Sequence, residues 1–185
     1  MDEGLPLTSA FPAAIHDDVA ILLSVMPSEP RPTPQAIGPI TVLGEPLHIP
    51  ARIYPLEMNE ASLSALTRTQ QRVLHCLYTR HHDGFVRQRH LRPLLACDEP
   101  WVVPFVVQLV GEYVLPILID IEAALRPHHA RAYGAFVQEN EAFMRLTGDR
   151  VCSYWNAYYR SPGVARRMHV GEVILRRLES FADTM

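Results

Sequence analysis

The stretch that decides the fold is WVVPFVVQLVGEYVLPILI, Trp101–Ile119, nineteen residues of which only Gln108 and Glu112 are strongly polar. Such an apolar stretch is buried either in a protein core or in a bilayer. A central glutamate costs a few kcal/mol in lipid, Pro104 and Pro116 interrupt the run, and the flanking residues are acidic where basic anchors would be expected. We therefore expect a buried core helix, kinked or split at Pro116, and no membrane span.

The composition around this stretch is that of a folded protein of one domain. The chain has 185 residues, 48% hydrophobic and 20% charged, with a formal net charge of −3. This charge provides no basic field for nucleic acid, which we do not expect as a partner. The 17 basic residues are all arginine, which excludes enzymes that need a Schiff-base or phosphate-loop lysine. An acidic start, Met1-Asp2-Glu3, and three scattered cysteines favour a protein with reduced thiols in the cytoplasm.

The regions on either side of the apolar stretch predict a mainly α fold: a compact bundle of about seven helices around one long apolar helix. An N-terminal helix over residues 10–26 is followed by PSEPRPTPQAIGP, residues 27–39, whose five prolines predict an extended arm. Two short apolar runs over residues 40–54, around Gly44-Glu45-Pro46, predict a small β-hairpin. We expect residues 1–39 to form a helix and proline-rich arm, and residues 40–185 to form a single mainly helical domain.

Local signals place the remaining helices. Thr67 and Gln70 have the spacing of a capping box, and the helix they begin is expected to reach His81 and to end at Gly84. A short helix is expected over residues 87–96. Four more are expected over residues 130–139, 141–146 (ended by Gly148), 149–160 and 171–182.

The first candidate site is Arg80-His81-His82-Asp83-Gly84, at the expected end of a helix. Two adjacent imidazoles beside a carboxylate can bind a divalent metal or serve as an acid–base pair, so we take His81, His82 and Asp83 as candidate metal ligands. The structural interpretation is that histidine suits a helix C-terminus and that Asp-Gly is a good turn. Apart from this metal, no cofactor is expected.

The second candidate is Glu112, a carboxylate inside the apolar stretch. If the helix is continuous, Gln108, Glu112, Pro116 and Asp120 share one stripe of it, because they are spaced four apart. That stripe is either the solvent face of the helix or the lining of a polar cavity. In the second case Glu112 faces arginine or histidine from residues 80–90 and joins His82 and Asp83 as a candidate catalytic residue.

The third candidate is the most basic stretch, residues 80–92, with four arginines and three histidines against one aspartate. We take Arg80, Arg87 and Arg89 as candidate binding residues. Arg87-Gln88-Arg89 opens the second helix of an arrangement that is weakly similar to a helix-turn-helix. The simpler interpretation is a solvated basic face, or a source of salt bridges for the acidic ends of the apolar stretch.

The last candidate is the aromatic run near the C-terminus. Val151, Trp155 and Tyr159 share a helical face and are expected in the core. Tyr154 and Tyr158 are then expected beside that face, exposed, where tyrosine is typical of binding hot spots.

The sequence carries no phosphate-loop, dinucleotide-binding or zinc-protease motif. The first functional hypothesis is therefore a helical interaction or regulatory protein of the adaptor kind, without catalytic activity, that binds a protein partner or self-associates as a homo-oligomer. The alternative is a metal-dependent or acid–base enzyme using His82, Asp83 and Glu112. A helix-turn-helix nucleic-acid binder is the third.

Overall fold

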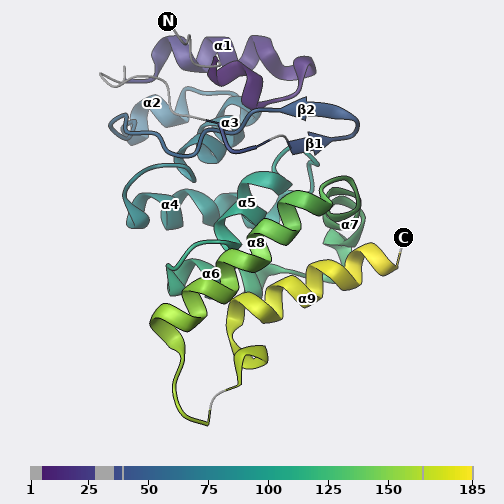
Figure 1. The fold of residues 1–185 in the computed structure, drawn as a ribbon. Coiled ribbons are helices and arrows are strands. Elements are labelled where there is room, and N and C mark those ends of the chain that lie inside the picture. The colour runs from purple at the N-terminus through teal and green to yellow at the C-terminus, as the bar shows by residue number, and fades with distance from the viewer. Residues whose placement is uncertain (1–5, 28–35, 39, 164, 185) are drawn as a thin grey trace, which may run out of the picture. The chain divides into compact units, whose positions relative to one another are not determined.

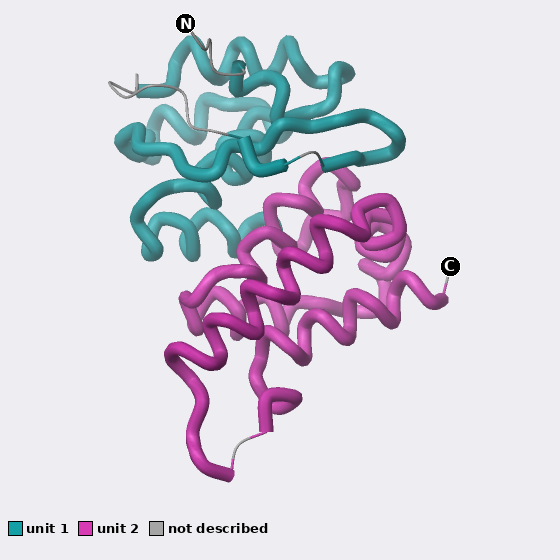
Figure 2. Tube along the Cα trace, viewed as in Figure 1, with its two compact units in different colours: residues 1–94 teal, residues 95–185 magenta. Residues whose placement is uncertain are grey.

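The computed structural model describes residues 6–27, 36–38, 40–163 and 165–184. Most of the predicted proline-rich arm, residues 28–35 and 39, lies outside the described residues. The chain divides into two compact units, Met1–Leu94 and Leu95–Met185 (Figure 2). The predicted boundary between residues 39 and 40 does not coincide with this division, and it stays a prediction.

The helices of the first unit are α1 (His16–Val25), α2 (Glu60–Ser64), α3 (Arg68–Tyr78) and α4 (Gly84–Leu91) (Figure 1). Two 3-10 turns, Leu7–Ala10 and Ala13–Ile15, precede α1, and a third, Arg92–Ala96, follows α4. The predicted capping box is confirmed: Thr67 Oγ1 accepts from the Gln70 backbone N–H, and the Gln70 side chain accepts from Thr67 N–H. Gln70 Nε2 also donates to Asp18 Oδ1 of α1 at 3.0 Å. This bond links α3 to α1, against which α3 packs.

The predicted hairpin is present. Strands β1 (Ile40–Val42) and β2 (Glu45–Leu47) pair antiparallel, with Ile40 opposite Leu47. The two turn residues, Leu43 and Gly44, both have positive φ, at 53° and 80°. Two successive positive φ values characterise the turn whose twist matches that of a two-residue hairpin.

Gly84 has a different role from the predicted one. The prediction that it ends the helix of Thr67 is wrong: α3 ends at Tyr78, and Gly84 is the first residue of α4. Asp83 caps α4, because its Oδ1 accepts from the Phe85 backbone N–H at 2.7 Å. Glycine after a capping aspartate begins a helix here, and the Asp-Gly pair therefore belongs to an N-terminus.

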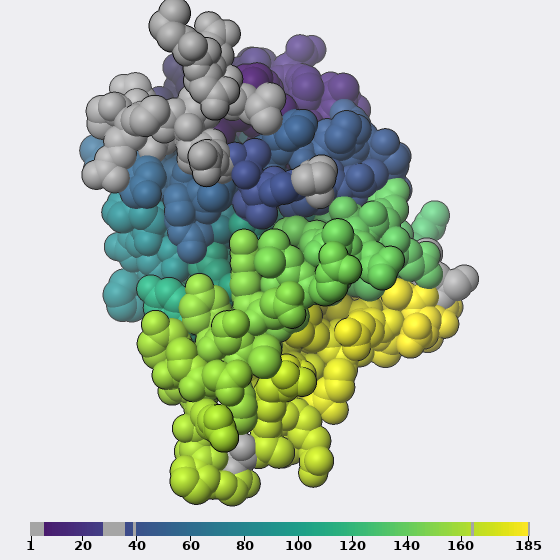
Figure 3. Space-filling view, viewed as in Figure 1, coloured from purple at the N-terminus to yellow at the C-terminus, as the bar shows by residue number. Residues whose placement is uncertain are grey.

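The second unit contains α5 (Val103–Val110), α6 (Leu115–Ala124), α7 (Ala130–Glu139), α8 (Glu141–Tyr154) and α9 (Val170–Asp183). A π-helical turn, Trp155–Tyr159, extends α8. Helix α9 packs against α7, α6 and α8, and its contact with α8 lies on the face seen in Figure 3. Every residue of α5 is buried, as expected for the centre of the apolar stretch. The predicted helix 130–139 is confirmed to the residue, whereas Gly148 lies within α8 and does not end a helix.

The apolar stretch is split, as Pro116 predicted. Helix α5 ends before Gly111, residues 111–114 form a turn, and Pro116 lies in the first turn of α6, where a missing N–H is tolerated. Glu112 therefore belongs to a turn, and the predicted stripe of Gln108, Glu112, Pro116 and Asp120 does not exist as one helical face. Gln108 and Glu112 are also buried, so their interpretation as a solvent face is wrong.

The fold class is the predicted one, mainly α with one small antiparallel hairpin near the N-terminus. Within the described part of the chain, no helix has the length and apolar character that crossing a membrane requires.

Candidate functional site

The first candidate site lies in the first unit, where the extended segment 53–58 runs beside the turn between α3 and α4. Ile53 N–H donates to the Arg80 carbonyl at 2.9 Å, and His82 N–H donates to the Ile53 carbonyl at 3.0 Å. These two bonds form a short parallel bridge between Ile53 and His81. The bridge positions the histidine pair of the turn against the residues that follow Ile53.

His81 and Asp83 both serve the backbone of this turn. His81 Nε2 contacts the Pro55 carbonyl at 3.1 Å and must donate to it, because a carbonyl only accepts. His81 Nδ1 then accepts from the Asp83 backbone N–H at 3.1 Å. Burial is the main cause that lowers the pKa of His81, which keeps this ring neutral. Neither ring nitrogen offers a lone pair to a metal in this arrangement.

The ring of His82 lies beside that of His81, with centroids 4.3 Å apart. The His82 ring is exposed and stacks on Tyr54, with centroids 5.1 Å apart. Within the described residues, no group of three or more histidine, cysteine, aspartate or glutamate side chains is arranged to hold a metal ion. The metal site at His81, His82 and Asp83 is therefore unsupported by this geometry, and it stays a prediction.

The three candidate binding arginines have different environments. Arg80 is 1% exposed and donates to the Ala51 carbonyl. Arg87 is 3% exposed, and its NH1 donates to the carbonyls of His81 and His82 at 2.8 Å each. Arg89 is exposed and pairs with Glu57 at 3.3 Å. The expected solvated basic face is thus wrong for Arg80 and Arg87, and their roles as binding residues stay predictions.

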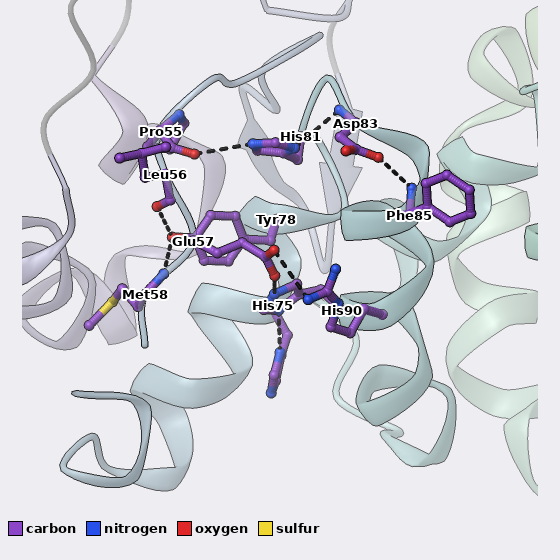
Figure 4. A network of polar contacts seen from close by, with 11 residues as sticks. Pro55, Leu56, Glu57, Met58, His75, Tyr78, His81, Asp83, Phe85 and His90 are labelled. Carbon is purple, nitrogen blue, oxygen red and sulfur yellow. Dashed lines mark hydrogen bonds and ion pairs between the residues drawn. The ribbon is translucent and has the colours of Figure 1, made fainter. Parts of the chain in front are cut away.

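The site that the sequence did not reveal is a hydrogen-bonded chain of Glu57, His90 and His75 (Figure 4). Glu57 Oε1 lies 2.8 Å from His90 Nε2, and His90 Nδ1 lies 2.8 Å from His75 Nδ1. The carboxylate only accepts, so His90 donates from Nε2. A neutral His90 then accepts at Nδ1, and His75 is the donor in the contact between the two rings.

Tyr78 packs against His90 of this hydrogen-bonded chain. Its ring centroid is 4.6 Å from that of His90, its hydroxyl donates to the Leu56 carbonyl at 2.7 Å, and the same hydroxyl accepts from Met58 N–H. Burial raises the pKa of Tyr78 to about 12, which keeps the hydroxyl protonated. The two bonds fix the backbone on both sides of Glu57, and they thereby hold its carboxylate toward His90.

Burial is also the main cause that lowers the pKa values of the two histidines. It lowers the pKa of His75 to about 4, with His90 as a second cause, and it lowers the pKa of His90 despite the nearby Glu57. The bond between the rings requires that one Nδ1 carries a proton and the other does not. The hydrogen-bonded chain therefore suits two neutral imidazoles beside the Glu57 side chain.

Sequence reasoning could not have found these partners. Glu57 and His90 are 33 positions apart, and Glu57 lies in an extended segment without a motif. His75 was adjacent to a cysteine but carried no other signal, and only His90 belonged to a stretch singled out for its charge.

Glu112 lies in the second unit and is 8% exposed. Its expected pairing with arginine or histidine from residues 80–90 joins residues of two different units, and it stays a prediction.

The second candidate site, also in the second unit, is a tyrosine cluster formed by Tyr113, Tyr154 and Tyr158. The rings of Tyr154 and Tyr158 stack at 6.1 Å, and Tyr113 from the turn before α6 lies 5.6 and 5.8 Å from them. Tyr113 is 52% exposed and Tyr158 is 66% exposed. The sequence predicted that Tyr154 and Tyr158 are exposed, which holds for Tyr158, whereas Tyr154 is partly buried. It missed Tyr113, whose position beside Glu112 in the apolar stretch suggested burial.

The π-helical turn that contains Tyr158 also contributes Trp155 to a pocket. Trp155, Arg160, Ser161, Pro162 and Gly163 line an open pocket of about 520 Å³. Tyr159, from the same turn, points elsewhere: its hydroxyl donates to the Tyr113 carbonyl, and its ring lies 5.0 Å from that of His169. Tyr159 thus links the π-helical turn to the turn that carries Tyr113. This bond holds the exposed rings of Tyr113 and Tyr158 close to Tyr154, whose ring is partly buried.

Comparison with known protein families, with curated proteins and with solved structures finds no match to this chain.

Proposed function

We propose that this chain is a protein-interaction protein of the adaptor or regulatory kind, and that the tyrosine cluster is its binding surface. The observation that supports the proposal is the exposure of Tyr113 and Tyr158 within a cluster whose rings contact one another. Large exposed aromatic side chains with few accessible rotamers bind partners at a low entropic cost, and tyrosine is enriched at binding hot spots. The proposal includes a cytoplasmic location, no catalytic activity and no cofactor.

The test is site-specific photo-cross-linking. A photoreactive phenylalanine analogue at position 158 is compared with the same analogue at position 85, where Phe85 is 78% exposed but lies in the other unit. We expect position 158 to cross-link a protein, either another or a second copy, and position 85 not to. The purified partner should then bind the wild-type chain, and Tyr158→Ala should weaken that binding about tenfold or more while Phe85→Ala does not. Equal cross-linking from both positions contradicts the proposal.

The metal-dependent or acid–base enzyme built on His82, Asp83 and Glu112 is the alternative proposal. It predicts stoichiometric metal in protein purified without chelator, and a melting temperature that rises with added divalent metal in the wild type but not in His82→Ala. Absence of both effects would leave the interaction proposal. The helix-turn-helix proposal predicts salt-dependent retention on DNA, which loss of Arg89 should reduce.

A further inference from the structure

We propose that the tyrosine cluster and the Trp155 pocket bind a proline-rich segment in the polyproline II conformation, and that the occupant is residues 27–39 of a second copy of this chain. The proposal rests on the proposed function, because it names the partner class of the same surface. It is carried by the chemistry of the described rings and by the sequence of the segment.

The surface has the side chains that polyproline II ligands require. Such a ligand has no internal hydrogen bonds, so its carbonyls stay free to accept from tyrosine hydroxyls and from an indole N–H, and its proline rings pack flat against aromatic rings. Tyr113, Tyr154 and Tyr158 provide three adjacent rings, spaced 5.6 to 6.1 Å apart. Trp155 belongs to the same π-helical turn as Tyr158 and lines the open pocket.

The proline spacing of residues 27–39 suits binding to this row of aromatic rings. Residues 27–39 read PSEPRPTPQAIGP, and Pro27-Ser28-Glu29-Pro30 has prolines three apart. Polyproline II has three residues per turn, so Pro27 and Pro30 of a bound segment lie on one edge and meet neighbouring rings. Glu29 between them offers a carboxylate to Arg160, which lines the Trp155 pocket.

A second copy is the occupant because each chain carries both parts of the interaction. The end of the segment is held in the first unit, where Ala36 bridges to Pro50 and Ile37 N–H donates to the Ile49 carbonyl at 2.8 Å. The tyrosine cluster belongs to the second unit. Two copies can therefore exchange segments reciprocally, which gives a closed symmetric dimer in which the same contact is made twice.

The experiment measures self-association of the full-length chain by sedimentation velocity over a wide concentration range. The variants are Tyr113→Ala/Tyr158→Ala on the surface, Pro27→Ala/Pro30→Ala on the segment, and Phe85→Ala as the control. Circular dichroism checks that each variant is folded, which we expect because the replaced tyrosines are more than half exposed. A synthetic peptide of residues 27–39 is added as a competitor, with its proline-to-alanine version as the peptide control.

We expect a wild-type dimer whose dissociation constant rises about tenfold or more in both double variants and stays unchanged in Phe85→Ala. The peptide should dissociate the dimer and its alanine version should not. A chain that stays monomeric overturns this proposal: if it binds the peptide, the second copy is the wrong occupant, and if it does not, the ligand class is also wrong. A dimer that needs the tyrosines but not the prolines overturns the ligand class and leaves the interaction surface standing. A dimer that needs the prolines but not the tyrosines shows that the segment binds elsewhere, which contradicts both proposals.

Discussion

Acidification should destabilise the chain through His75, and the structure gives the size of the effect. The pKa of His75 is about 4 in the folded chain, against an ordinary value of 6.5. Between these values the unfolded chain binds a proton that the folded chain does not, so this stability is present above pH 6.5 and is lost as the pH falls toward 4. At pH 5 the loss relative to pH 7.5 has an upper value of roughly 2 kcal/mol, and about 1 kcal/mol after allowing for solvent screening of a partly exposed ring.

The assay is urea unfolding followed by circular dichroism at pH 7.5, 6.5, 5.5 and 5, values that run from above the ordinary pKa of 6.5 into the window between 6.5 and about 4. The variant is His75→Gln, whose side-chain amide can still donate to His90 Nδ1 but does not titrate. We expect the variant to lose about 1 kcal/mol less than the wild type between the two extremes of pH. The control is His48→Gln, which lies outside the Glu57–His90–His75 chain, does not shift the pKa of His75, His81 or His90, and should keep the wild-type dependence. Parallel pH profiles for wild type and His75→Gln would refute the reasoning.

Three further predictions concern local structure. Leu43→Asn should stabilise the chain by roughly 0.5 kcal/mol, because asparagine tolerates the positive φ that precedes Gly44 and Leu43 is 72% exposed; a lower melting temperature would contradict this. Thr67→Ala should cost about 1 kcal/mol in urea unfolding by removing the cap of α3, whereas Thr67→Ser should restore most of it. Asp83→Ala should cost about 1 kcal/mol by removing the cap of α4, and Asp83→Ser should cost much less. Stability measurements with and without divalent metal should give the same losses, and a loss seen only with metal would favour the metal site.

The parts of the fold that the sequence predicted are those determined by neighbouring residues. The capping box of Thr67, the hairpin around Gly44 and the splitting of the apolar stretch near Pro116 each follow from residues within a few positions of one another. Where glycine was used to end helices the prediction was wrong twice, at Gly84 and at Gly148. A glycine that ends a helix usually adopts the left-handed conformation itself, and neither Gly84 nor Gly148 has a positive φ.

The candidate site was harder to predict because its partners meet only in the folded chain. The sequence shows that His81, His82 and Asp83 precede a glycine that favours a turn, but nothing in their spacing shows that the Pro55 carbonyl lies beside His81. The Pro55 carbonyl belongs to an extended segment 26 positions before His81, and its hydrogen bond to His81 Nε2 determines which nitrogen of that ring carries the proton. The sequence names the titratable groups, whereas tertiary structure determines which of them still have a lone pair or a proton to offer.

The turn between α3 and α4 and the tyrosine cluster differ in how far their side chains are already engaged in bonds within the fold. In the turn, His81, Asp83, Arg80 and Arg87 direct polar atoms to backbone groups of the same unit, and such bonds would have to break before these atoms could bind anything else. A ligand there would have to repay the cost of leaving buried backbone groups unsatisfied, about 1 to 3 kcal/mol for each. The tyrosine cluster imposes no such cost, because the rings of Tyr113 and Tyr158 already face solvent and would bury apolar surface on binding. Binding at the turn therefore works against the stability of the first unit, whereas binding at the tyrosine cluster leaves the second unit as it is.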